Sequence, residues 1–108
     1  MRIVELARNL GLERDDYISL MRVFLQTTTG DLDELDTALE ENDLVRGSEI
    51  AHHIRGASIN LGLQKIAEAA RATELSAKRN GLEAAIAAAR SIRAELQSTS
   101  RTIGQLSE

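Results

Sequence analysis

Residues 49–62 read EIAHHIRGASINLG, and they belong to a segment with a helical pattern. Apolar and small side chains recur there at intervals of three and four residues, as they do on the buried face of an α-helix. Asp43 can cap the start of this helix, and Gly62 ends or kinks it. A helix is therefore predicted over residues 43–62, with an inner face formed by Ile50, Ala51, Ile54, Ala57, Ser58 and Leu61.

The segment before it has a longer seam of the same period. Apolar and threonine side chains alternate by three and four from Ile18 to Leu39, and the seam passes Gly30 without a change of phase. The poor helix formers at residues 27–30 cost about 2 kcal/mol in total relative to alanine. One helix over residues 16–41 is predicted, and two helices divided at residues 27–30 are the alternative.

The remaining segments add three further amphipathic patterns, separated by short turns such as Asn80-Gly81. Short connections make successive helices antiparallel. Proline is absent and the only aromatic residues are one Tyr and one Phe, which disfavours a β-sandwich or barrel. The prediction is an all-α fold, an antiparallel up-down four-helix bundle with a short extra N-terminal helix, formed by residues 1–108 as a single domain. The further segments are residues 1–10, residues 63–79 and the residues from Leu82 onward.

Composition and charge exclude several classes of protein. The chain has no cysteine, which rules out disulfides and Cys-ligated metal. The net charge of −4 argues against nucleic acid as the main partner, because phosphate binding requires a basic face. No apolar run is long enough to span a membrane, so no membrane association is predicted and a cytoplasmic location is expected.

The two histidines of the chain, His52 and His53, are adjacent. On a helical wheel His52 points about 160° away from the centre of the inner face, and His53 about 100° away, at its boundary. A neutral imidazole is a nucleophile near pH 7. Arg55 and Gly56 follow one turn later on the side of His52, where a cation would stabilise a phosphoryl group on the ring. A glycine within a helix costs about 1 kcal/mol, which suggests that something must approach the imidazole closely there.

These residues resemble a known signature. Residues 51–62 are similar to the core motif of histidine-containing phosphotransfer (HPt) domains, roughly A-H-x-L-K-G-S-A-x-x-L-G. Arg55 stands where that family usually has Lys, and Thr73 stands where Leu is usual. The flanks agree in order and spacing through Phe24-Leu25, Asp31-Leu32, Leu35, Ala38-Leu39, Thr73-Glu74, Lys78 and Asn80-Gly81.

The resemblance implies a phosphorelay intermediate of two-component signal transduction. A receiver-domain aspartate would donate a phosphoryl group to His52, which would pass it to another receiver; Arg55, Gly56 and Lys78 would support the transfer. The implied partners are response-regulator receiver domains and a hybrid sensor histidine kinase. No metal or other cofactor is expected on this chain, since Mg²⁺ would belong to the receiver. The chain lacks a phosphate-binding loop, G-x-x-x-x-G-K-[ST], so phosphorylation from ATP is not expected.

Apolar side chains near His52 predict where a receiver would dock. Val45 and Ile59 lie two turns before and after His52 and within about 20° of it, and Leu63 joins them if the helix continues past Gly62. Exposed apolar residues around a reactive group are typical of a contact site. The alternative is that they pack against a neighbouring helix, in which case Leu63 in particular turns inward.

The sequence also admits three other interpretations. Glu49-x-x-His52 matches half of a di-iron motif, but the second copy would need a second His outside the dipeptide. The acidic residues 31–43 are interpreted as a solvated helix face that favours the following helix N-terminus, rather than as a partner-selecting patch. The alternative function is a helical adaptor that binds receivers without phosphotransfer.

Overall fold

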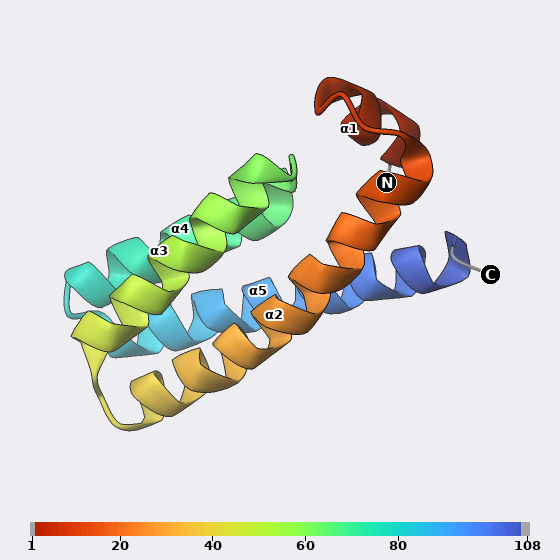
Figure 1. The fold of residues 1–108 in the computed structure, drawn as a ribbon. Helices are drawn as coiled ribbons and strands as arrows, with labels where there is room; N and C mark the ends of the chain where they lie inside the picture. Colours follow the sequence, from red (N-terminus) through yellow and green to blue (C-terminus); the bar gives the residue numbers. More distant parts are fainter. Residues whose placement is uncertain (1, 107–108) are drawn as a thin grey trace.

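The computed structural model describes residues 2–106, and these form helices with no strand among them (Figure 1). The all-α prediction is confirmed for this part of the chain, which is a helical bundle. The predicted start of the first helix at Met1, and the ends of the predicted domain at Met1, Ser107 and Glu108, lie outside the described residues. The helices are α1 (Ile3–Asn9), α2 (Arg14–Glu40), α3 (Leu44–Asn60), α4 (Gln64–Lys78) and α5 (Leu82–Leu106).

Helix α2 is continuous through residues 27–30, so the prediction of a single helix is confirmed and the alternative of two helices is wrong. Thr28 is buried in phase with the apolar seam, and the Thr29 hydroxyl donates a hydrogen bond to the Leu25 carbonyl (2.7 Å). Packing of the apolar face supplies most of the stability of a helix inside a protein. The buried seam therefore outweighs the low helix propensity of these residues.

The long helices surround one core. Helix α2 contacts α3 and α5, α4 contacts the same two helices, and α1 packs against α2. Helices α3 and α4 lie side by side on one side of the bundle (Figure 1). The hydroxyl of Tyr17, a buried residue of α2, donates a hydrogen bond to the Leu61 carbonyl (2.7 Å) and thereby ties α2 to the end of α3.

Helix α3 begins as its sequence predicts. The Asp43 side chain accepts a hydrogen bond from the backbone N–H of Arg46 (3.1 Å), which is the expected N-cap. The inward direction of the helix is also confirmed, since Ala51, Ile54 and Ser58 are buried. The outer members of the predicted inner face, Ile50, Ala57 and Leu61, are only half-buried.

The prediction that Leu63 belongs to the exposed surface around His52 is wrong. Helix α3 does not continue past Gly62, which adopts a left-handed conformation (φ +75°) that glycine tolerates best. The chain turns there, and Leu63 is only 6% exposed and joins the hydrophobic core at the start of α4.

No helix within residues 2–106 combines the length and the apolar character needed to cross a lipid bilayer.

Candidate functional site

Both histidines of α3 reach the surface. The side chain of His52 is 63% exposed and that of His53 is 69% exposed. The helical wheel places His53 at the boundary of the buried face, but its side chain is at least as exposed as that of His52. The two side chains differ instead in their neighbours: Nε2 of His53 lies 3.8 Å from Oδ2 of Asp31 on α2, whereas His52 faces α4.

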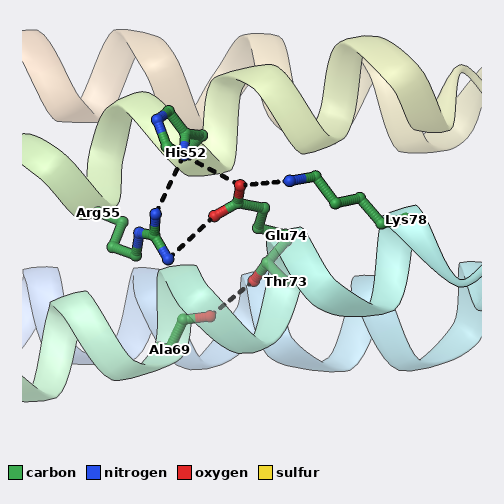
Figure 2. Close-up of polar contacts among 6 residues, drawn as sticks. All are labelled: His52, Arg55, Ala69, Thr73, Glu74 and Lys78. Carbon is green, nitrogen blue, oxygen red and sulfur yellow. Dashed lines mark hydrogen bonds and ion pairs between the residues drawn. The ribbon is translucent and has the colours of Figure 1, made fainter.

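The His52 ring contacts a buried carboxylate. Its Nδ1 atom lies 3.0 Å from Oε2 of Glu74 on α4 (Figure 2). The Glu74 side chain is only 4% exposed. Two cations reach the same carboxylate: Nζ of Lys78 donates to Oε2 (3.0 Å), and Nη1 of Arg55 lies 3.5 Å from Oε1. We call His52, Arg55, Glu74 and Lys78 the Glu74 cluster.

Glu74 is held in its charged form by this cluster. Burial by itself would raise the pKa of the Glu74 carboxyl group. Hydrogen bonds from Lys78 and His52, together with the positive charges of Arg55 and Lys78, outweigh burial and hold the pKa below its usual value. The imidazole of His52 therefore lies against an ionised carboxylate at neutral pH.

The contacts within the Glu74 cluster indicate which nitrogen of the His52 ring carries the proton. Nδ1 lies 3.0 Å from a Glu74 acceptor and 3.2 Å from Nη2 of Arg55, which is a donor. A ring nitrogen can donate to the first only when it carries a proton, and can accept from the second only when it does not. The carboxylate is closer and buried, and an unprotonated Nδ1 would set its lone pair against that charge. We therefore assign the proton to Nδ1 and the lone pair to Nε2.

Nε2 makes no hydrogen bond or ion pair within the described part of the chain. The exposed ring therefore presents an unoccupied nucleophilic nitrogen, while the other nitrogen is fixed by Glu74. The same division of labour lets a carboxylate orient a catalytic histidine in hydrolytic enzymes.

The structure brings three of the four predicted transfer residues together and leaves the fourth beside them. Arg55 and Lys78 contact Glu74, and through it they lie next to His52 (Figure 2). Gly56 lies on the next turn of α3 after His52, and a methyl group at its Cα would meet no atom within 4 Å outside its own helix. The helix is therefore open to solvent at this point.

Two of the three predicted docking residues are exposed and the third is buried. Val45 and Ile59 are exposed, and 60% of the Ile59 surface is accessible. Leu63 is buried, as described above, so it cannot touch a partner in this conformation.

Glu74 is the member of the candidate site that the sequence pattern did not single out, since it appeared there only as part of a flanking motif. Its position carried a usable signal. It falls in the buried seam of α4 together with Ala70 and Ala77, and Lys78 follows at the i+4 position. A carboxylate inside an apolar seam requires a partner, and the opposite helix carries His52 and Arg55.

The acidic residues near the end of α2 are mostly engaged within the protein. Asp33 and Asp36 contact the guanidinium of Arg93 on α5 at 3.2 and 2.8 Å, and Glu34 lies 3.7 Å from Arg46. These pairs favour the interpretation as a solvated helix face. No group of three or more metal-ligating side chains occurs within residues 2–106.

Comparison with known proteins identifies the family. A family model described as "Hpt domain" matches residues 19–102, which is more than three quarters of the chain and includes the whole Glu74 cluster. Comparisons with curated proteins and with solved structures give no match. Hpt domains work with receiver domains in the phosphorelays of two-component signalling. With its exposed histidine and this match over most of its length, the chain belongs to the Hpt domain family.

Proposed function

We propose that the protein is a phosphorelay intermediate that accepts a phosphoryl group from a receiver-domain aspartate on Nε2 of His52 and passes it to another receiver. The observation that carries this proposal is the hydrogen bond between Nδ1 of His52 and the buried carboxylate of Glu74 (3.0 Å). It leaves Nε2 with its lone pair on an exposed ring. Membership of the Hpt family supports the choice of receiver domains as partners.

Transfer of the phosphoryl group does not require Nε2 to lose a proton. The Nε2 lone pair forms a bond to phosphorus while the bond from phosphorus to the aspartate oxygen breaks, and the aspartate departs as a carboxylate. Because Nδ1 already holds the proton, the ring gains positive charge, and the Glu74 carboxylate stabilises that charge. The reverse sequence donates the group to a second receiver. The receiver supplies Mg²⁺, and this chain is proposed to work without a cofactor of its own.

Arg55 and Lys78 support the transfer through their contacts with the Glu74 carboxylate. In the structure the Arg55 guanidinium lies on the Nδ1 side of the imidazole, 3.2 Å from that atom and 3.5 Å from Oε1 of Glu74. Oε1 is buried and makes no hydrogen bond within the described residues, so Arg55 is its ionic partner there. The two cations keep the carboxylate charged and oriented, which in turn holds the His52 ring.

We also propose that the helices form an antiparallel up-down four-helix bundle, with α1 as an extra N-terminal helix. The contacts of each long helix with two others support this arrangement. In Figure 1 the chain reverses its direction between successive long helices. This arrangement keeps α3 and α4 in register, so that His52 faces Glu74.

The experiment that tests the function uses the intact chain. The protein is incubated with a receiver domain carrying radiolabelled phosphate, and the label that it acquires is tested for the acid lability and base stability of phosphohistidine. His52→Gln should remove the label and His53→Gln should keep it. A wild type that binds the receiver without acquiring label would instead favour the non-catalytic adaptor.

A further inference from the structure

A shallow groove runs between α3 and α4 next to the Glu74 cluster. It has a volume of about 290 Å³ and is lined by Arg55, Ile59, Gln64, Ala67, Glu68 and Arg71. Arg55 also contacts the His52 ring, so the groove is continuous with the site of phosphorylation. We call it the α3–α4 groove.

Its charges are not balanced within the protein. Arg55 is engaged by Glu74, but Arg71 is exposed and makes no hydrogen bond or ion pair with any residue in the range 2–106. Glu68 is the groove's only acidic lining residue, and Ile59 adds an exposed apolar side chain. The groove therefore suits a partner surface that offers a carboxylate beside an apolar side chain.

The opposite flank of His52 has a different character. The groove between α2 and α3 is lined by the exposed Leu20 and Val23, by His53 and by Asp31, and no lysine or arginine contributes to it. A carboxylate of a partner would be repelled by Asp31 there. Of these two grooves, only the α3–α4 groove is lined by arginine side chains, and this asymmetry can orient a docked protein.

The geometry points to Arg71 as a residue that selects and orients the receiver domain, by pairing with a carboxylate on the rim of the receiver's phosphorylation site. This inference rests on the proposed function. A protein that binds Mg²⁺ beside a phosphoryl group does so with carboxylates, so acidic side chains are expected around a receiver's phosphorylation site. Complementary charge near the reacting groups speeds encounter and suppresses wrong partners.

The test compares variants in steady-state phosphotransfer. The probe is whichever receiver domain, in a panel of purified response regulators, exchanges phosphate fastest with the wild-type chain. Arg71→Glu should raise KM for that receiver about tenfold or more and change kcat less than twofold, since the residue acts on docking and not on chemistry. Added salt should shrink the difference from wild type, because it screens exposed charges.

Two controls separate the possible causes. Arg101→Glu changes the net charge by the same amount on α5, outside the groove, and should leave KM within twofold of wild type. Labelling of His52 by phosphoramidate, a small donor that needs no docking surface, should proceed at the wild-type rate in Arg71→Glu.

An unchanged KM in Arg71→Glu would overturn the inference, and so would a fall in kcat alone or a loss of phosphoramidate labelling. If the wild type exchanges phosphate with no receiver although phosphoramidate labels His52, the proposed function fails, and the inference that rests on it fails too.

Discussion

Replacing Gly56 by alanine should make the protein more stable and a poorer phosphotransfer partner. Gly56 lies inside α3, four residues after His52, and an added methyl group would meet no atom within 4 Å outside its own helix. Alanine is favoured over glycine in a helix by about 1 kcal/mol. For a chain of this size, that gain corresponds to a rise in melting temperature of about 4 °C or more.

The same methyl group should slow transfer from a receiver. It would stand on the surface where the receiver's aspartate must come within bonding distance of Nε2. A misplacement of about 1 Å can cost on the order of 100-fold in rate, so a reduction of about tenfold or more is expected. The measurements are thermal unfolding by circular dichroism and single-turnover transfer from a phosphorylated receiver.

Gly30 provides a matched control. It also lies inside a helix, on α2, and an added methyl group there would likewise meet nothing within 4 Å. Gly30→Ala should raise the melting temperature by a similar amount and leave the transfer rate unchanged. A Gly56→Ala variant that is stabilised like Gly30→Ala and still transfers phosphate at the wild-type rate would refute this prediction. The absence of a side chain at Gly56 would then not be needed for the receiver's aspartate to reach His52.

Three further predictions concern the neighbours of His52. Arg55→Ala should slow transfer about tenfold or more, as expected from losing about 1.5–3 kcal/mol of charged interaction; single-turnover rates equal to wild type would show that Arg55 does not support the transfer. The folded state holds the pKa of Glu74 below its unfolded value, so the carboxylate stabilises the fold at neutral pH, and this contribution is lost as the pH falls through the lowered folded-state pKa. Urea unfolding between pH 7 and pH 3 should accordingly show a weaker acid dependence in Glu74→Gln than in wild type, and equal slopes would contradict the assignment of charge. Ile59→Glu and Val45→Glu should weaken receiver binding, measured by calorimetry, while the free energy of unfolding falls by less than about 1 kcal/mol, because both side chains are exposed; a larger loss of stability would argue for a structural role.

Hydrophobic periodicity was sufficient to predict the helices. The spacing of the seam from Ile18 to Leu39 correctly predicted a single α2, although residues 27–30 favour a break. Local propensity amounts to about 2 kcal/mol there, whereas a continuous buried face gains more from packing. The ends of the helices were also predicted closely: residues 63–79 were expected to be helical, and α4 spans Gln64–Lys78.

Contacts between helices could not be predicted in the same way. A helical wheel that continues past Gly62 places Leu63 on the surface, but the left-handed turn at that glycine rotates Leu63 into the core. His53 was expected at the edge of the core, but its side chain remains exposed beside Asp31. In both cases the outcome depends on how neighbouring elements are arranged in space, which the pattern of one helix does not contain.

The candidate site was predicted only in part for the same reason. His52, Arg55 and Gly56 lie on one helix, and their spacing and resemblance to a known motif were enough to single them out. Glu74 lies on another helix, and its importance depends on the 3.0 Å contact with Nδ1 of His52 across the α3–α4 interface. The ion pair of Arg55 with Glu74 likewise adds a contact that the pattern of one helix does not reveal.

The most direct test of the account is to identify the nitrogen that carries the phosphoryl group. The protein is prepared with ¹⁵N-labelled histidine, and its imidazole resonances are recorded before and after transfer from a phosphorylated receiver. The account predicts a His52 ring protonated at Nδ1 at rest, and a phosphorus bond at Nε2 of His52 after transfer. A resting ring protonated at Nε2, or a phosphoryl group on Nδ1 or on His53, would contradict it.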